Sequence, residues 1–543
     1  MVLKNSLNWF TGFFFLIFNK FRKIYLNSSI YNNKISKINE STLNYRPSLD
    51  ILKCLFKYES TPKNINEYIL NSIWKDSRIN KKEFKKLNSF FWLFTLDLKS
   101  SKKNTQSVIL NWIEANKNYD NNNWEIDTLS RRIIAWISNS KLTYEESTEN
   151  YKNKFNFIIK KQINHLINEI DRSKFLNDKI IGCTAIILSG ISYDAKKILD
   201  YGLNLLKKIC FISFDPQGFP KSRNFRQLVF YLKHLITIRE FLKESQSVIP
   251  DHLNEYIFYL GQSYNFIWQS TKKNYLFNGN HQVTHEEFDK YLTNKGYKFQ
   301  NKLLEQGGYA LLKNKNVSIM MDIGPSPEKK FCKNFQSGVL SFEMYFSGEK
   351  IISNSGYFQN LKHQLNSISR STASHSTLTL DNSSVCKFRK KSNGDIYIED
   401  NFKVISKKIV FEKNYWSLKG GHNGYQKKYG IIHDRELEFF PETTLLKGKD
   451  ILIKRKNSKN TNFEIRFHFI PGTKITKTQN EKSILLEFEN SGWRFSCNHF
   501  NLDIETGLYF GNKNKFLENQ NINIAGITNN DYQIIEWDLK LIK

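Results

Sequence analysis

The sequence has few cysteines and lacks the short motifs of several common catalytic classes. Its six cysteines stand far apart, with no Cys-x-x-Cys pair, at Cys54, Cys183, Cys210, Cys332, Cys386 and Cys497. A zinc ribbon or a redox-active pair is therefore not expected. The patterns GxxxxGK(S/T), GxGxxG, HExxH and GxSxG are also absent. These absences speak against nucleotide-dependent, zinc-protease and serine-hydrolase chemistry.

A long hydrophobic run is also missing near the start of the chain. The apolar stretch from Leu7 to Phe18 is about as long as the core of a signal peptide and too short to span a bilayer. A basic cluster with Lys20, Arg22 and Lys23 follows it, where a small-x-small cleavage site would be expected. Residues 1–40 therefore have three open interpretations: a signal-like segment, a membrane-surface helix, or a helix packed on the protein body.

Acidic residues are scarce compared with basic ones. The chain has 81 Lys and Arg against 52 Asp and Glu, a formal net charge of +29. This excess indicates a polyanionic partner, or else the composition of an AT-rich genome. The scattered positions of the lysines favour the compositional explanation as much as a partner. Among polyanions, the candidates are an acidic polysaccharide and nucleic acid, and for nucleic acid no RNP-like or zinc-finger pattern is present.

The chain divides into a helical part and a strand-rich part. Its 543 residues are 40% hydrophobic, so two or three domains with large cores are expected. Residues 41–305 contain apolar positions at three- and four-residue spacing, as in Ser130–Ile137, joined by short polar links. Short links favour antiparallel helix pairs, arranged as a closed toroid or an open solenoid. No strict repeat period is visible.

Short alternating runs dominate residues 306–543 and predict a β-sandwich. The stretch from Asn334 to Asp381 begins this pattern. In it, Val339–Phe346 and Lys350–Ser353 read as two strands joined by a turn at Ser347 and Gly348.

Several motifs in both parts resemble the heparinase II/III-type polysaccharide lyases. The motifs are Asp215–Asn224, the hairpin Ser341–Tyr345 leading to Gly356, Arg370–Leu378 (R-x-T-x-x-H-N/S-T in the family), Gly421–Tyr425 with His433–Leu437, and Phe463–Gly472. The resemblance implies a multidomain α+β fold: an N-terminal α/α toroid over 41–305, then an antiparallel β-sandwich over 306–543. The segment 1–40 precedes them.

The sequence departs from the family at its zinc site. Metal-bearing members hold zinc with a His-x-Asp motif, a second Asp and a later His. The corresponding residues here are Gln336, Gly338, Asn354 and His375, so only the last ligand remains. Because side-chain amides are poor zinc ligands, we expect neither zinc nor another cofactor.

The resemblance also implies β-elimination at a uronic-acid residue of an anionic polysaccharide. Such a carbon–oxygen lyase must neutralise the uronate carboxylate, so that the charge developing on it is stabilised. Asn224 and Arg223 are the candidates for this role. Their alternative role is structural, because Ser222 or Asn224 could cap the helix that follows.

A second group must remove the C5 proton and protonate the leaving oxygen. His375 and His422 are candidates for the base or for a positioning group, and their alternative roles are a loop cap and a tight turn. The acid is expected among Tyr231, Tyr275 and Tyr291.

A second function is consistent with the same fold. Loss of the zinc ligands would also fit a catalytically inactive scaffold that binds glycan during envelope polysaccharide assembly. Both functions predict a location in the cell envelope or periplasm, with the cytoplasmic face of a membrane left open. Residues 1–40 could then contact a membrane peripherally.

Overall fold

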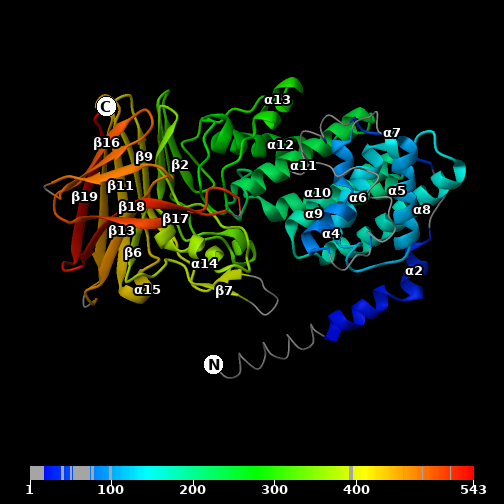
Figure 1. The fold of residues 1–543 in the computed structure, drawn as a ribbon, viewed down its shortest axis with the longest axis horizontal. Coiled ribbons are helices and arrows are strands. Elements are labelled where there is room, and N and C mark those ends of the chain that lie inside the picture. The colour runs from blue at the N-terminus through cyan, green and yellow to red at the C-terminus, as the bar shows by residue number, and fades with distance from the viewer. Residues whose placement is uncertain are drawn as a thin grey trace. The chain divides into compact units, whose positions relative to one another are not determined.

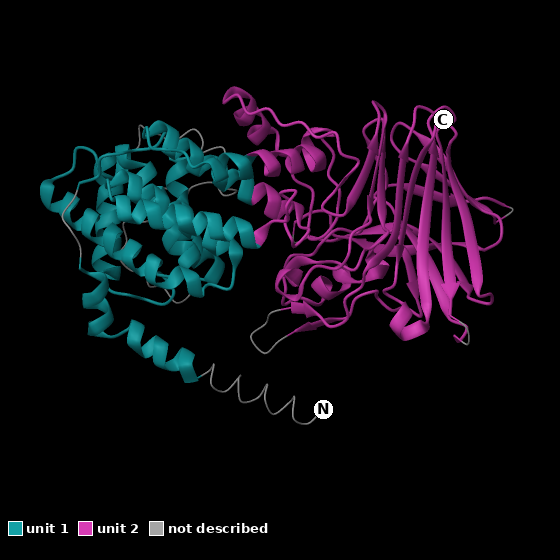
Figure 2. Ribbon diagram, turned by 180° about the vertical axis from the view of Figure 1, so that it is seen from behind, with its two compact units in different colours: residues 1–212, 231–257 teal, residues 213–230, 258–543 magenta. Residues whose placement is uncertain are grey.

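A computed structural model provides the structure of the protein. It describes residues 17–37, 42–48, 52, 74, 79–96, 101–390, 396–455, 458–479, 481–513 and 515–543. The chain forms two compact units (Figure 2). Unit 1 comprises Met1–Ile212 and Tyr231–Ile257, and unit 2 comprises Ser213–Phe230 and Phe258–Lys543.

Unit 1 is helical (Figure 1), and its core forms because its helices bury their apolar side chains. In α6 (Ile126–Ser138), Ile133, Trp136 and Ile137 are buried, as their spacing predicts. α6 packs against α8 (Glu149–Glu169) and α9 (Leu176–Ser192). The other labelled helical elements with residues in this unit are α2 (Ser29–Ile35), α4 (Lys81–Asn88), η3 (Phe91–Thr95), α5 (Lys102–Asn116), α7 (Ser140–Thr143), η4 (Ile170–Arg172), α10 (Lys196–Ser213), α11 (Phe225–Glu244) and α12 (Asp251–Tyr264).

Unit 2 contains the strands. Within its described residues, one antiparallel sheet has the order β1-β2-β3-β4-β5 and a second has the order β14-β15-β16-β19-β12-β11-β10-β9. A third has the order β17-β18-β13-β6, and β7 pairs with β8. The strands are β1 (Glu305–Gln306), β2 (Tyr309–Lys313), β3 (Val317–Asp322), β4 (Phe342–Phe346), β5 (Glu349–Ile352), β6 (Leu378–Leu380), β7 (Phe388–Lys390), β8 (Ile396–Ile398), β9 (Val404–Phe411), β10 (Trp416–His422), β11 (Ile431–Phe440), β12 (Leu445–Lys454), β13 (Asn462–His468), β14 (Lys474–Lys477), β15 (Ser483–Glu487), β16 (Gly492–Cys497), β17 (Leu502–Tyr509), β18 (Leu517–Ile527) and β19 (Tyr532–Leu541).

The sheets share one apolar core. Along β11, residues alternate between buried and partly exposed, which is the pattern of a strand with one face on the core. Trp537 of β19 joins the sheets, because its ring stacks on Phe342 of β4 at 5.8 Å and meets Phe467 of β13 edge-on at 4.6 Å. The predicted antiparallel β-sandwich is therefore confirmed.

The hairpin between β4 and β5 is present, but its first strand is shorter than predicted. Ser347 and Gly348 have φ values of 46° and 98°, which place both turn residues in the left-handed region. The strand begins at Phe342 and not at Val339, because Leu340 has a φ of 59° and its N–H donates to the Asp322 carbonyl. The chain thus bends before it enters the sheet.

The boundaries of the two compact units do not coincide with the point in the sequence where helices give way to strands. The first strand begins at Glu305, whereas unit 2 already includes residues 213–230 and the segment from Phe258 onward, with α13 (Glu286–Asn294). Among the helices that the structure describes, none has both the length and the apolar character needed to cross a membrane.

Candidate functional site

Arg223 lies in unit 2 at the end of the loop that precedes α11. Its guanidinium donates to Asp322 Oδ1 at 2.6 Å and to three backbone carbonyls at 2.9 to 3.2 Å. It also stacks over the ring of Tyr309 at 4.5 Å. Asp322 is buried as well, so the two charges compensate each other away from water. This geometry favours a structural role for Arg223, although its predicted binding role is not tested by it.

Asn224 is the N-cap of α11, as its residue type predicted. Its Oδ1 accepts from the backbone N–H of Gln227 at 3.0 Å. The Nδ2 group is buried and has no hydrogen-bond partner among the described residues. It points at Gly279, where an added Cβ would lie 2.5 Å from it. The cap thus uses only half of the amide and leaves two N–H donors unused.

Arg226, one turn into α11, was not singled out by the sequence. No ion pair or hydrogen bond joins its guanidinium to any described residue, and its Nε is buried. Burial lowers the pKa of Arg226 to about 10, and the nearby Tyr357 opposes this shift. An uncompensated cation in such surroundings is costly and is often found where an anion binds. Arg223 and Arg226 look alike in sequence, and only their tertiary surroundings distinguish them.

The side chain that interacts with this guanidinium is Tyr357. The hydroxyl of Tyr357 donates to Asn334 Oδ1 at 3.3 Å and accepts from Arg370 at 2.7 Å. Asn334 contacts Gly279 from one side, as Asn224 does from another. We call Asn224, Arg226, Gly279, Asn334 and Tyr357 the α11 cluster.

His375 is fully buried in unit 2. Its Nδ1 lies 2.8 Å from the Ser371 carbonyl, so this nitrogen carries the proton, and Nε2 has no partner among the described residues. Burial lowers the pKa of His375 to about 4, so the ring is neutral at pH 7. The ring lies against Gly338, where an added Cβ would come within 2.4 Å of it. An Asp at position 338 would therefore displace the imidazole.

The residues at the family's zinc position do not fit a zinc ion. The Gln336 amide donates to two backbone carbonyls and accepts from the N–H of Gly279 at 2.8 Å. Asn354 Oδ1 accepts from the N–H of Ser376 at 2.9 Å. Only Nε2 of His375 remains as a good donor, whereas zinc requires about four ligands. Within the described residues, no three His, Cys, Asp or Glu side chains are grouped to hold a metal.

His422 belongs to a buried hydrogen-bonded chain. Its Nδ1 accepts from the N–H of Gly424 at 3.1 Å, and its Nε2 lies 3.3 Å from Nδ1 of His433. Nε2 of His433 lies 2.7 Å from Asp450 Oδ1, which also accepts from Arg435 at 2.8 Å. Because Nδ1 of His422 accepts a hydrogen bond, its proton is on Nε2 and is donated to Nδ1 of His433. The proton of His433 is then on Nε2 and is donated to Asp450. Both nitrogens of His422 are thus occupied, and burial holds its pKa well below the usual value.

The three candidate tyrosines lie apart. Tyr231 is buried in unit 1, whereas Tyr275 and Tyr291 belong to unit 2. The Tyr275 hydroxyl donates to Ser318 Oγ at 2.8 Å, and burial raises the pKa of this phenol. Tyr291 lies in α13 and is mostly buried. None of the three makes a recorded contact with His375 or His422 in the described part of the chain.

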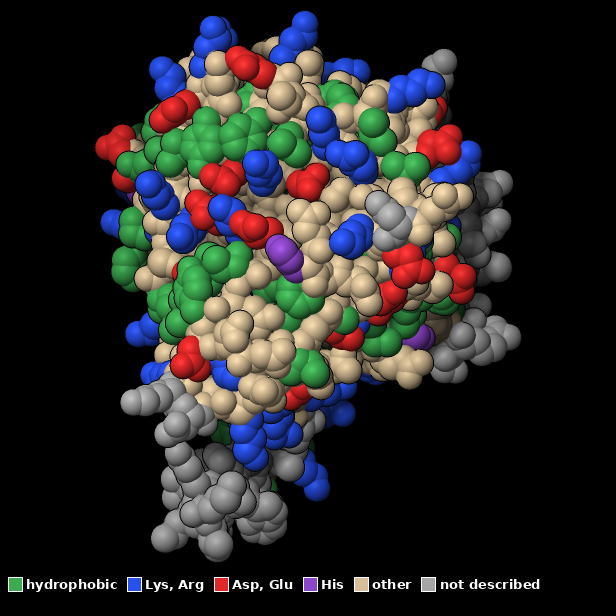
Figure 3. Space-filling view, turned by 90° about the vertical axis from the view of Figure 1, so that its left-hand side faces the viewer, with side chains coloured by type: hydrophobic (Ala, Val, Ile, Leu, Met, Phe, Trp, Pro, Cys, Tyr) green, Lys and Arg blue, Asp and Glu red, His purple; other side chains and the backbone are tan. Residues whose placement is uncertain are grey.

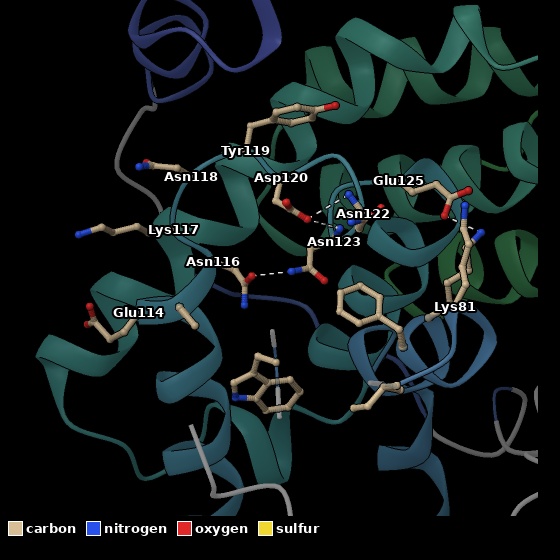
Figure 4. A pocket seen from close by; sticks show the side chains of 15 residues that line it. Lys81, Glu114, Asn116, Lys117, Asn118, Tyr119, Asp120, Asn122, Asn123 and Glu125 are labelled. Carbon is tan, nitrogen blue, oxygen red and sulfur yellow. Dashed lines mark hydrogen bonds and ion pairs between the residues drawn. The ribbon is translucent and has the colours of Figure 1, made fainter. Parts of the chain in front are cut away.

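Three cavities of ligand size occur in the described residues. One of about 780 Å³ lies in unit 1, where Asn123 donates to Asn116 at 2.5 Å and Asp120 accepts from two backbone N–H groups (Figure 4). One of about 720 Å³ in unit 2 lies beside residues 401–407. The largest, about 1190 Å³, lies beside the turn at Gly424 and Tyr425. None of the predicted site residues lines these cavities.

The largest cavity is mainly basic. Five basic side chains face two acidic ones across it: Lys329, Lys387, Lys427, Lys428 and Arg455 against Glu399 and Asp400. By contrast, the face of the molecule shown in Figure 3 mixes acidic, basic and apolar side chains. The excess positive charge is thus unevenly distributed, with one concentration near a motif shared with the lyase family.

The comparisons with known proteins agree with this architecture. The family model described as heparinase II/III-like, C-terminal, matches residues 298–538. The heparinase III BT4657 gene product matches with a TM-score of 0.68 and 13% identity, over 90% of this chain and 85% of that chain. A mutant of heparan sulfate lyase HepC from Pedobacter heparinus matches with a TM-score of 0.66 and 13% identity, over 94% and 87%.

A crystal structure of heparinase III matches with a TM-score of 0.66 and 14% identity, over 94% of this chain and 88% of that chain. No curated protein matches the sequence. Identities this low show the fold alone, and they confirm the predicted α/α toroid followed by a β-sandwich. Residues 298–538 therefore match the heparinase II/III-like C-terminal family model, and the chain shares its fold with the solved heparinase III structures.

Proposed function

We propose that this protein is a polysaccharide lyase that cleaves a uronic-acid-containing anionic polysaccharide by β-elimination. The observation that carries the proposal is a pair of buried donors two positions apart, Arg226 Nε and Asn224 Nδ2, which have no hydrogen-bond partner among the described residues. These groups lie at the N-terminal end of α11, in a fold of the lyase type. The site thus offers a positive charge, N–H donors and a helix N-terminus, all of which attract a carboxylate.

The chemistry follows from this pairing. Arg226 and Asn224 donate to the uronate carboxylate, so the negative charge that develops when C5 loses its proton is stabilised. The C5–H electrons form the C4–C5 double bond, the C4–O bond breaks, and the leaving oxygen takes a proton. Tyr357 is the proposed acid and base, because its hydroxyl is held in place by hydrogen bonds with Arg370 and Asn334. His375 and His422 then support the fold without touching substrate.

The test is the absorbance of unsaturated uronate near 232 nm during incubation with a panel of uronic-acid polysaccharides. A rise is expected with the parent protein, and a fall of about 100-fold or more in rate with Arg226→Ala and with Tyr357→Phe. Arg172→Ala is the matched control, because Arg172 is exposed, lies in unit 1 and belongs neither to the α11 cluster nor to the basic cavity. If Arg226→Ala retained the parent rate, the proposed site would be wrong.

A second function is supported by the burial of the candidate catalytic groups. His375, His422 and Tyr357 are each at most 1% exposed, so burial counts against all three as groups that reach a substrate. A catalytically inactive scaffold that binds glycan during envelope polysaccharide assembly would need only the basic cavity and the α11 cluster. Binding of a uronate polysaccharide without any rise at 232 nm, on every substrate tried, would favour this function.

The remaining proposals concern partners and location. An anionic polysaccharide is the proposed partner, without nucleic acid, and the cell envelope or periplasm is the proposed location. The reaction is proposed to need no zinc, because Gln336 and Asn354 use their amides within the protein. Peripheral membrane contact near the start of the chain is argued next.

A further inference from the structure

A helix over residues 17–26 exposes a strip of apolar side chains. Phe18, Phe21 and Ile24 are 55%, 68% and 61% exposed, and Tyr25 is 39% exposed. Their spacing of three and four residues places them along one side of the helix. Single exposed apolar residues are ordinary, whereas a contiguous aromatic strip marks an interaction surface.

An adjacent side of this helix is attached to unit 1. Arg22 donates through Nε to Glu169 Oε2 at 3.1 Å and makes a second contact with the same carboxylate. Leu26 is buried, and the following helix α2 buries Tyr31 and Ile35. These contacts hold the helix (blue in Figure 1) by the side of Arg22 and Leu26 and leave Phe18, Phe21 and Ile24 exposed.

Lysines flank the strip. Lys20 and Lys23 are exposed, and residues 17–26 contain no acidic side chain. At 100° per residue, both lysines fall between the apolar strip and the attached side. The helix therefore presents an apolar band with a positively charged border. This charge is complementary to an anionic surface and repels a second copy of the same helix.

We infer that the helix over residues 17–26 binds the surface of an anionic lipid bilayer. Helices of this kind lie in the plane of the interface, with aromatic residues among the acyl chains and lysines at the headgroups. The inference is independent of the proposed lyase activity.

Sedimentation of the full chain with vesicles tests this site. Vesicles of phosphatidylcholine with phosphatidylglycerol are compared with vesicles of phosphatidylcholine alone. The variant Phe18→Ser/Phe21→Ser/Ile24→Ser is expected to bind the anionic vesicles at least about tenfold more weakly than the parent. The control Val248→Ser/Leu303→Ser/Ile542→Ser removes three equally exposed apolar side chains elsewhere and should bind like the parent.

A second pair of variants tests the lysines. Lys20→Gln/Lys23→Gln should weaken binding to anionic vesicles by about fivefold per lysine, and the loss should shrink at high salt. The control Lys298→Gln/Lys413→Gln removes the same net charge from exposed positions outside this helix and should have little effect.

Three results would overturn the inference. The first is no sedimentation of the parent with anionic vesicles. The second is equal binding by the serine variant and its control. The third is self-association that requires Phe18 and Phe21 while vesicles are not bound, which would assign the strip to a second copy. Circular dichroism of each variant confirms that the fold is retained.

Discussion

The guanidinium of Arg223 lies 2.6 Å from Oδ1 of Asp322, and both side chains are almost fully buried. This ion pair joins the loop before α11 to the end of β3. The pair neutralises the Arg223 guanidinium within the protein interior. Arg226, three residues later, has no such partner among the described residues. The contrast explains why the two arginines are expected to respond differently to substitution.

The first prediction concerns Asp322. Asp322→Asn keeps the shape of the side chain but leaves Arg223 as an uncompensated buried cation, so the free energy of unfolding should fall by about 3 kcal/mol. Chemical denaturation measures this change. Glu399→Gln is the control, because it breaks exposed ion pairs with Lys387 and Arg389, and the unfolding midpoint should not move.

The second prediction is that the Arg226 side chain lowers the free energy of unfolding and strengthens the binding of uronate polysaccharide. Arg226→Met should raise the free energy of unfolding by about 1 kcal/mol, because a desolvated cation is replaced by an apolar side chain. The same variant should bind uronate polysaccharide more weakly in a titration. Arg370→Met is the comparison and should destabilise the protein, because Arg370 donates to several buried oxygens. Loss of stability in Arg226→Met would contradict the assignment.

The third prediction concerns the close approach of Asn224 to Gly279. Gly279→Ala places a Cβ 2.5 Å from the amide of Asn224 at a φ of +84°, so both a clash and backbone strain are expected. Gly472 has a φ of +90° and no atom within 4 Å of an added Cβ, so Gly472→Ala carries the strain alone. Thermal unfolding should show the larger loss for Gly279→Ala, with glycan binding reduced only in that variant.

The fourth prediction concerns pH. The pKa of His375 is lowered to about 4 by burial, so the folded state holds this ring neutral while the unfolded state takes up a proton below about pH 6.5. Stability should therefore be complete above that pH and fall by about 1.4 kcal/mol per pH unit as pH drops from about 6.5 to 4. His468, with its pKa lowered to about 3, adds in the same direction.

Unfolding curves at several pH values check this prediction. His375→Asn should show a shallower dependence than the parent over the same range, because its amide does not titrate. His499→Asn is the control at an exposed histidine and should follow the parent curve. Identical slopes for all three proteins would mean that His375 is not held neutral by burial.

The fifth prediction concerns metal. Because Gln336 and Asn354 direct their amides to backbone groups, the purified protein should contain no stoichiometric zinc by elemental analysis. Treatment with a chelator should leave both the unfolding midpoint and glycan binding unchanged. A stoichiometric metal whose removal lowers the midpoint would show that the donor set has been misjudged.

Much of the fold could be predicted because local pattern and burial agree. The three-residue spacing of Ile133 and Trp136 lies in α6, which is buried on nearly all sides, and the alternation along β11 reflects one buried face of a sheet. The cap at Asn224 could also be read from the sequence, since a side-chain oxygen at a helix start satisfies nearby N–H groups whatever the tertiary fold.

The site depended on tertiary structure. Arg223 and Arg226 have the same chemistry and neighbouring positions, but Asp322, about a hundred residues away, pairs with only one of them. His422 precedes a turn that could face a cleft, yet His433 and Gly424 occupy both of its nitrogens. The sequence by itself determined the order of helices and strands, because those patterns are local. Contacts between segments far apart in the sequence decided which charged side chains are paired and which are not. Burial and pairing depend on the whole fold.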